Sequence, residues 1–398
     1  MAILDNQTTA PSTHVLIVGV DDYKHLPRED GGGPQVAGHE YAPGLTKIST
    51  AAPSAQRLAN WFLNGFTNPQ RPLGSLDVLL STGAFSEGAK PPTAVATPTF
   101  ENLKTAFRQW RDRCAAHDNN HAIFYFCGHG FEESSHYLLP EDALDDPGDV
   151  TGKFIDFDAT LTLMGQCRAR AQLYFVDACR SPFPKRLQDI RKAAMEAAIN
   201  QGQAPRPLGK ALLGNEAGPF FEPRNAVIYK SAGRKGAPAK SRRGQESYFV
   251  EALIECLKNF GAANDFGSGE HWVRIESLRD ALQERMRRSS RKNSLEEVGF
   301  DFDPFRFNPN LNPDLHLIAS PIVQTKIQLD PSSRHTETTI ELEGPKKYSC
   351  PPGPGPWEHE MEPGIYDVTF NFDPPLPKRG PMKKVLSMPV YPAKWPLP

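Results

Sequence analysis

Two side chains capable of covalent chemistry follow two apolar runs of the chain. Cys179 comes directly after the run AQLYFVDA, and His129 comes directly after HAIFYFCG and stands between two glycines. A cysteine attacks a carbonyl carbon as a thiolate, and a nearby imidazole both lowers the pKa of the thiol and later protonates the leaving amine. The flanking glycines let backbone N–H groups approach a substrate carbonyl closely. The two residues therefore predict a Cys-His dyad.

The segments before both residues are typical of buried parallel strands, because they are short, apolar and rich in aromatic and β-branched side chains. Similar runs alternate with helical patterns up to about residue 320, which predicts an α/β fold with a mostly parallel, six-stranded sheet flanked by helices. The six runs are 14–20, 77–82, 122–128, 172–178, 226–232 and 314–320. Chemistry in such open sheets takes place beyond the carboxyl ends of the strands, so we expect Cys179 and His129 at one edge.

Apolar residues recur at helical spacing between these runs. The pattern at Leu103 and Phe107 predicts a helix with Thr97 as its N-cap and Pro98 in its first position. A second, amphipathic pattern, RLQDIRKAAMEAAINQ, lies in a long insertion of about residues 181–224 that directly follows the cysteine. Insertions of this length in a compact domain are usually functional or disordered.

Residues 321–398 have a different character. Strand-like pieces alternate apolar and polar residues with a period of two, and prolines crowd the connections, as in PPGPGPW. This pattern predicts a small, Pro-rich domain that resembles a β-sandwich. We therefore expect two domains, residues 1–320 with the insertion at about 181–224, and residues 321–398.

Composition excludes several classes of partner. The 398 residues carry 45 Lys and Arg against 47 Asp and Glu, a balance that gives no signal for binding nucleic acid or an anionic membrane. No apolar run approaches the roughly 20 residues that cross a bilayer, and the first residues lack the pattern of a signal peptide. Six cysteines without a CxxC pair are typical of reduced thiols. We expect a cytoplasmic protein that acts on proteins.

The chain resembles the caspase-hemoglobinase fold family, in particular metacaspases, paracaspases and their prokaryotic relatives. The similar segments, within residues 14–260, are HVLIVGVDDY, FYFCGHGFE, FVDACRS, AVIYKSAG and SYFVEALIECL. The separation of 50 positions between His129 and Cys179 also matches the spacing in caspases. The resemblance implies a cysteine endopeptidase with Cys179 as nucleophile, His129 as general acid and base, and an oxyanion hole formed by the N–H groups of Gly130 and Cys179. It further suggests a prokaryotic defence or cell-death cascade.

The same resemblance bears on specificity through Asp177 and Ser231, which it places in the substrate-binding pocket. Family members that cut after arginine or lysine carry aspartate two residues before the cysteine, and a carboxylate can bind a guanidinium in a bidentate manner. The chain departs from the metacaspase pattern at two places. Ser54 stands where metacaspases usually carry aspartate, and the basic segment GRKGAPAKSRRG follows Ser231, where they tend to carry an acidic residue. In the alternative interpretation Asp177 only caps the following turn. The chain could also be an aspartate-specific protease or an inactive scaffold of the same fold.

The insertion after the cysteine predicts regulation, because in the family this linker is often cut during activation. We expect a zymogen whose linker is cut by the protein itself or by an upstream protease. The candidate processing sites are the basic residues Lys185, Arg186, Arg191, Lys192, Arg206 and Lys210. In the alternative interpretation the segment is an ordinary solvated helix.

No cofactor or metal is predicted, with one possible exception. The acidic segment EDALDDPGD, residues 141–149, has the hard oxygen ligands that suit calcium, which some metacaspases bind. It lacks the ordered spacing of an EF-hand, so a solvated turn is the alternative.

Overall fold

The computed structural model falls into two compact units, one of residues 1–251 with 286–311 and one of residues 252–285 with 312–398. The division into domains at residue 320 stays a prediction. The structure describes residues 2–30, 41–146, 149–202, 204, 207–214, 225–233, 244–264, 270–292, 299–330, 332–372, 382–386 and 391–396.

The first unit is built on a central sheet of seven strands in the order β1-β3-β2-β6-β10-β12-β15. The five inner strands run parallel, and β1 and β15 pair antiparallel at the two edges. The expected α/β class is confirmed. The strands are β1 (Ala2–Asp5), β2 (Thr13–Gly19), β3 (Leu73–Leu80), β6 (His121–Gly128), β10 (Ala171–Ala178), β12 (Asn225–Lys230) and β15 (Asp301–Arg306).

The prediction of a six-stranded central sheet is wrong in two respects. One predicted strand lies elsewhere, and the sheet has seven strands. Residues 314–320 contribute only β16 (His316–Leu317), which joins β14 (His271–Val273) and β13 (Ala262–Asn264) in a separate antiparallel sheet of the second unit. The edges of the central sheet are filled by β1 and β15 instead. Antiparallel edge strands do not need the continuous apolar run of a buried parallel strand.

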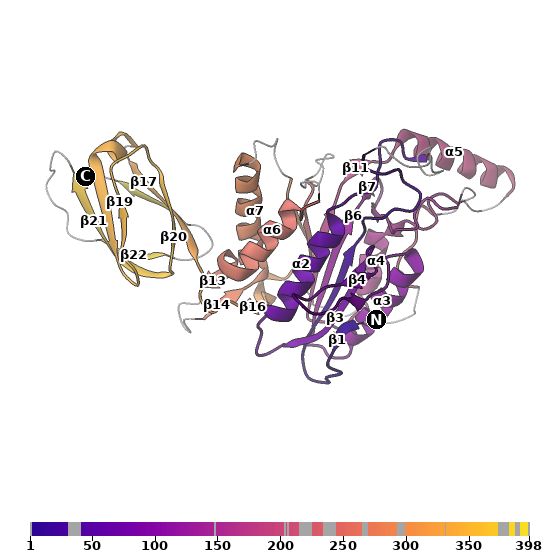
Figure 1. Ribbon diagram of the computed structural model, residues 1–398, viewed down its shortest axis with the longest axis horizontal. Coiled ribbons are helices and arrows are strands. Elements are labelled where there is room, and N and C mark those ends of the chain that lie inside the picture. Colours follow the sequence, from indigo (N-terminus) through magenta and orange to yellow (C-terminus); the bar gives the residue numbers. More distant parts are fainter. Residues whose placement is uncertain are drawn as a thin grey trace. The chain divides into compact units, whose positions relative to one another are not determined.

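Helices cover both faces of the central sheet (Figure 1). Residues of α3 (Phe100–Ala115) and α4 (Phe157–Met164) share a core cluster with Leu16 and Phe124, side chains of one sheet face. On the opposite face, a Cβ at Gly19 would lie 2.7 Å from a carbonyl oxygen of α2 (Ala51–Asn64). Since side chains alternate along a strand, α2 and α3 lie on opposite faces.

The start of α3 corrects the predicted N-cap. The helix begins at Phe100, and the cap is Thr99, whose side chain accepts a hydrogen bond from the N–H of Asn102. Asp142 adds a second cap, because its Oδ1 accepts the N–H of Phe100 at 2.8 Å. The extra carboxylate comes from a distant loop, so the local sequence around Thr97 could not indicate it.

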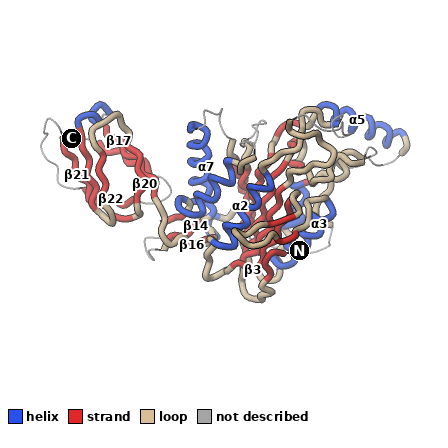
Figure 2. The backbone as a smooth tube through the Cα atoms, viewed as in Figure 1, coloured by secondary structure: helices blue, strands red, loops and turns tan. Residues whose placement is uncertain are grey.

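The C-terminal part of the second unit contains two sheets, in the orders β20-β17-β23 and β19-β18-β21-β22 (Figure 2). Ile327 and Leu329 of the first sheet share a buried core with Ile340, Leu342 and Tyr366 of the second, as expected for a β-sandwich. The strands are β17 (Val323–Asp330), β18 (Thr338–Glu343), β19 (Tyr348–Cys350), β20 (Trp357–Met361), β21 (Gly364–Phe372), β22 (Met382–Leu386) and β23 (Tyr391–Pro396).

The remaining strands and α-helices lie outside these sheets. They are β4 (Ala84–Phe85), β5 (Thr93–Ala94), β7 (Gly130–Glu132), β8 (His136–Leu138), β9 (Ile155–Asp156), β11 (Ser181–Pro182), α5 (Lys185–Asn200), α6 (Tyr248–Glu255) and α7 (Ile275–Lys292). Among the described residues, none of the helices combines the length and the apolar character needed to cross a membrane.

Candidate active site

Cys179 and His129 lie side by side at the carboxyl edge of the central sheet. The parallel strands β10 and β6 pair up to Ala178 opposite Gly128. The short strands β11 and β7 resume the same register, with Ser181 opposite Phe131. The two candidate catalytic residues therefore occupy matching positions on adjacent strands, which are about 4.8 Å apart in a sheet.

Cys179 is the only cysteine of the chain that is partly exposed. The other five are buried, and all six lie in described residues. Burial raises the pKa of the Cys114 and Cys127 thiols well above their usual value and that of Cys350 to about 12. A buried thiol is a poor nucleophile because it stays protonated. Exposure therefore singles out Cys179 as the candidate nucleophile.

The imidazole of His129 is held by backbone and side-chain contacts. Its Nε2–H donates to the carbonyl oxygen of Thr46 at 2.7 Å, and its backbone N–H donates to the hydroxyl of Tyr23 at 2.6 Å. The Tyr23 ring also packs on the imidazole, with ring centroids 4.7 Å apart. Burial lowers the pKa of His129, and the bond to Thr46 partly opposes that shift. The ring is therefore neutral at pH 7, and Nδ1 is the nitrogen that can take a proton.

Gly130 packs directly against the backbone of Cys179. A Cβ at Gly130 would lie 2.8 Å from the carbonyl oxygen of Cys179 and 3.0 Å from Nε2 of a second histidine, His136. Any larger residue would push these groups apart. The glycine that the sequence singled out is therefore required by this close approach.

Arg180, the residue after Cys179, forms ion pairs with carboxylates of two strands. Its guanidinium is almost fully buried and contacts Asp301 Oδ2 at 2.7 Å and Glu132 Oε1. Asp301 begins β15 and Glu132 ends β7. The carboxylates raise the pKa of Arg180 against the effect of burial, so the side chain stays charged. These two ion pairs therefore hold in place the backbone that follows Cys179.

Asp177 lies on β10, two residues before Cys179, and is buried among polar side chains. Its Oδ2 accepts hydrogen bonds from the hydroxyl of Tyr125 at 3.1 Å and from the hydroxyl of Ser247. Burial raises the pKa of Asp177, and these donors limit the rise. Ser231 lies close, because its N–H donates to the carbonyl oxygen of Val176 at 3.0 Å. The nearby Ser231 hydroxyl lowers the pKa of Asp177, although it makes no hydrogen bond of ordinary length to a described group.

Ser54, which stands where metacaspases usually carry aspartate, is linked to this group of side chains through Ser247. The Ser54 hydroxyl accepts the N–H of Ser247 at 2.9 Å and donates to the carbonyl oxygen of Thr50 at 2.7 Å. Asp177 is thus the only carboxylate in this set of side chains. The basic segment after Ser231 falls almost entirely on residues 234–243, outside the described residues.

Most candidate processing residues lie on one helix, α5, at the margin of the first unit beyond β7 and β11 (Figure 1). Lys185, Arg186 and Lys192 are exposed on it, and Arg191 pairs with Glu133 at 2.9 Å. Lys210 is exposed and forms an isolated β-bridge with Ile155. Arg206 lies outside the described residues.

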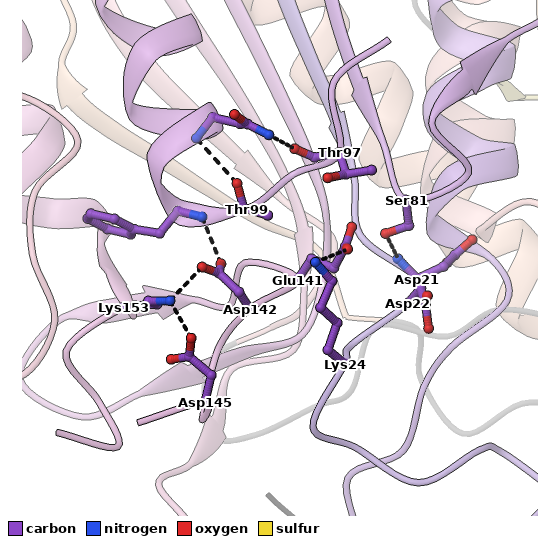
Figure 3. A network of polar contacts seen from close by, with 12 residues as sticks. Asp21, Asp22, Lys24, Ser81, Thr97, Thr99, Glu141, Asp142, Asp145 and Lys153 are labelled. Carbon is purple, nitrogen blue, oxygen red and sulfur yellow. Dashed lines mark hydrogen bonds and ion pairs between the residues drawn. The ribbon is translucent and has the colours of Figure 1, made fainter. Parts of the chain in front are cut away.

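The acidic loop around residues 141–149 is neutralised in part by lysines (Figure 3). Lys153 Nζ lies 2.9 Å from Asp142 Oδ2 and also contacts Asp145, and Lys24 Nζ lies 3.2 Å from Glu141 Oε1. In the part of the chain that the structure describes, no three His, Cys, Asp or Glu side chains form a group suited to a metal ion. Residues 147 and 148 of the loop lie outside that part. Calcium binding by this loop stays a prediction.

Four residues at the site were not indicated by the sequence. Thr46 contributes only a backbone carbonyl, so its residue type carries no signal. Tyr23 follows a strand that the sequence predicted, but nothing in the local pattern relates it to His129. His136 and Ser247 reach the site from a hairpin and from a helix start, and only the three-dimensional arrangement brings them there.

Comparisons with known proteins show a family match and two bacterial relatives. A family model described as the caspase domain matches residues 59–299. An uncharacterized protein of Sinorhizobium fredii is 28% identical over 247 residues, which are 57% of this chain and 65% of that protein. A probable protease of a Desulfuromonadales bacterium is 23% identical over 343 residues, which are 81% of this chain and 38% of the relative. The chain thus spans less than two thirds of the length of either relative.

Proposed function

The chain belongs to the caspase family, and we propose that it is a cysteine endopeptidase that cleaves proteins after arginine or lysine. The observation that carries the proposal is the shared register of Cys179 and His129 at the edge of the central sheet. The partly exposed thiol and the neutral, held imidazole are the two groups that acyl transfer requires.

The proposed reaction uses the two side chains in turn. His129 Nδ1 accepts the thiol proton of Cys179, and the thiolate attacks the scissile carbonyl carbon. The protonated imidazole then gives its proton to the leaving amine, which leaves a thioester on Cys179. Water, deprotonated by the same imidazole, hydrolyses the thioester and restores the thiol. The Thr46 carbonyl supports this cycle because it fixes the ring and accepts the Nε2 proton throughout.

The proposed oxyanion hole consists of the backbone N–H groups of Gly130 and Cys179. Support comes from the close packing of these two residues, which leaves no room for a side chain at Gly130. Preorganised N–H donors stabilise the negative oxygen of the tetrahedral intermediate, and loss of one such donor costs about 10²–10³ in kcat.

Basic specificity is proposed from the charge of Asp177. The carboxylate is buried among neutral donors, so a substrate guanidinium or ammonium would supply the positive charge that the pocket lacks. An acidic substrate side chain would meet a like charge instead. This repulsion disfavours the aspartate-specific alternative.

We further propose that the linker after Cys179 is cut during activation. The exposed basic residues of α5 support it, because they would suit the enzyme's own specificity or that of an upstream protease. A place in a bacterial defence or cell-death cascade stays a prediction, as does a cytoplasmic location.

Cleavage of fluorogenic peptides with Arg, Lys, Asp or Leu before the scissile bond tests the proposal. We expect turnover of the Arg and Lys peptides only, its loss in Cys179→Ala and His129→Ala, and a rise after limited nicking with trypsin. Cys350→Ala is the matched control, because that thiol is buried in the second unit. Equal turnover in Cys179→Ala would exclude the dyad. No turnover of any peptide by nicked wild type would favour an inactive scaffold.

A further inference from the structure

His136 is a second histidine at the candidate active site, and no step of the proposed reaction uses it. It lies at the start of β8, which pairs antiparallel with β7, so that His136 is opposite Glu132 and diagonal to Gly130. Its side chain is 1% exposed. The chain therefore buries an imidazole directly behind the two residues that would form the oxyanion hole.

The ring is bonded to the backbone of Cys179 and lies next to Gly130. Its Nε2–H donates to the carbonyl oxygen of Cys179 at 3.3 Å, and the same nitrogen lies 3.0 Å from where a Cβ of Gly130 would be. A carbonyl oxygen is only an acceptor, so this bond requires the Nε2–H tautomer. Nδ1 is buried and has no partner among the described residues.

The surroundings keep this ring neutral. Burial and the nearby cations Lys230 and Arg180 lower the pKa of His136 to about 3, against a smaller opposing effect of the bond to Cys179. The carboxylate of Asp158 accepts the backbone N–H of His136 at 3.1 Å. The imidazole is thus unsuited to exchange protons near pH 7, and its Nε2–H is a permanent donor.

We infer that His136 is a positioning residue that fixes the Cys179 carbonyl and thereby aims the N–H groups of Cys179 and Gly130 at the substrate oxyanion. The inference rests on the proposed protease function. The N–H and the carbonyl of Cys179 lie in consecutive peptide planes, which are related by only the two dihedral angles φ and ψ of that residue, so a fixed carbonyl restricts the donor. The imidazole also borders the space that a Cβ of Gly130 would enter, so it limits movement of the second donor.

The test compares two substitutions with different hydrogen-bonding capacity. His136→Gln keeps an N–H donor at a similar reach, whereas His136→Leu removes the donor and keeps an apolar side chain. His121→Leu is the matched control, because His121 is also a buried neutral histidine but begins β6 at the opposite end of that strand. Each full-length protein is assayed with the Arg peptide, and the rate of Cys179 alkylation by iodoacetamide is measured in parallel.

We expect His136→Leu to lower kcat by about 10–100-fold, because donors to the oxyanion act mainly in the transition state. KM and the alkylation rate should change less than about threefold, since the thiol and His129 remain in place. His136→Gln should recover most of kcat, and His121→Leu should leave it unchanged. The inference is overturned if His136→Leu matches the control, or if His136→Gln is as slow as His136→Leu.

Failure of the proposed function gives a different result. Wild type would then hydrolyse no peptide. The hydrogen bond from His136 to the Cys179 carbonyl can still be tested without activity, by ¹⁵N NMR of the imidazole. A neutral Nε2–H ring that does not titrate between pH 8 and 5 supports the contact. A ring that titrates in this range, or carries its proton on Nδ1, overturns the inference whatever the activity.

Discussion

The hydroxyl of Ser247 donates a hydrogen bond to the carboxylate of Asp177, across 70 positions of sequence. The same hydroxyl accepts the N–H of Val250 at 3.1 Å in the first turn of α6. Ser247 thus caps α6 and also donates a hydrogen bond to Asp177, the carboxylate proposed to select the substrate. Removal of the charge of Asp177 should therefore change specificity more than it changes the fold.

Asp177→Asn keeps the shape and one acceptor oxygen of this side chain but removes its charge. We expect kcat/KM for Arg and Lys peptides to fall about 10–100-fold, because a charge-assisted hydrogen bond is worth about 1.5–3 kcal/mol. Steady-state kinetics on peptides that differ only in the residue before the scissile bond measure the change. Asp156→Asn, at the N-cap of α4, is the control. Unchanged selectivity in Asp177→Asn would leave Asp177 as a structural cap only.

The local sequence was sufficient to predict the strands that carry the site. β6 and β10 are continuous apolar runs that end abruptly at polar residues, so their positions and the neighbourhood of His129 and Cys179 followed from pattern alone. β15 escaped prediction because its sequence, DFDPFR, contains charges and a proline. An antiparallel edge strand tolerates both, since one side of its backbone needs no partner.

The parts of the site that could not be predicted depend on contacts between distant segments. The Thr46 carbonyl would serve equally well from almost any residue type. His136 has the pattern of an ordinary strand residue, and its importance comes from the position of Gly130 and Cys179 around it. A single sequence therefore indicates the groups that react more readily than those that hold them.

Arg180→Met should destabilise the first unit. The substitution keeps most of the apolar stem but leaves Glu132 and Asp301 without their shared cation. Because both carboxylates are partly exposed, we expect a loss of about 1–3 kcal/mol in the free energy of unfolding, less than for a fully buried pair. Urea titration of each full-length protein measures it.

Arg168→Met is the matched control for this prediction. Arg168 pairs with Asp118 on the surface, where both side chains are about half exposed. Such pairs contribute about 0–1 kcal/mol. An equal loss of stability in the two variants would contradict the anchoring role of Arg180.

The free energy of unfolding should fall as the pH drops below 6.5, and His121 should account for part of the decline. Burial lowers the pKa of His121 from 6.5 to about 3, and both of its ring nitrogens lack a partner among the described residues. Below pH 6.5 the unfolded chain binds a proton that the folded chain does not, so this stabilisation is complete above pH 6.5 and is lost towards pH 3. The slope is at most about 1.4 kcal/mol per pH unit.

His121→Leu should remove this contribution to the slope. Urea midpoints between pH 8 and 5 would show a smaller decline in the variant than in wild type. His14, whose pKa burial lowers to about 4, has the same sign and remains as a residual slope in both proteins. Parallel curves for the two proteins would mean that His121 is solvated or paired in the folded state.

Cleavage within α5 should be limited by the helix itself. A protease needs an extended chain across its cleft, whereas Lys185, Arg186, Arg191 and Lys192 all lie on helical turns. Ala193→Pro removes a hydrogen bond of the helix interior and costs about 3 kcal/mol of helix stability. We expect cleavage after Lys185, Arg186 and Arg191 to be at least about tenfold faster than in wild type, because local opening precedes the cut. The bond after Lys192 is left out of the comparison, because a proline directly after it blocks cleavage.

Gel electrophoresis with mass spectrometry of the fragments follows this reaction over time. Ala193→Ser keeps the helix and is the matched control at the same exposed position. Introduction of Cys179→Ala into each protein separates cutting by the chain itself from cutting by added trypsin, which stands in for an upstream protease. Self-cleavage should be absent from every protein that carries Cys179→Ala. Trypsin should still cut the Ala193→Pro protein faster than the Ala193→Ser protein. If proline and serine variants are cut at equal rates, the helix does not protect the linker, and control of activation must lie in another segment.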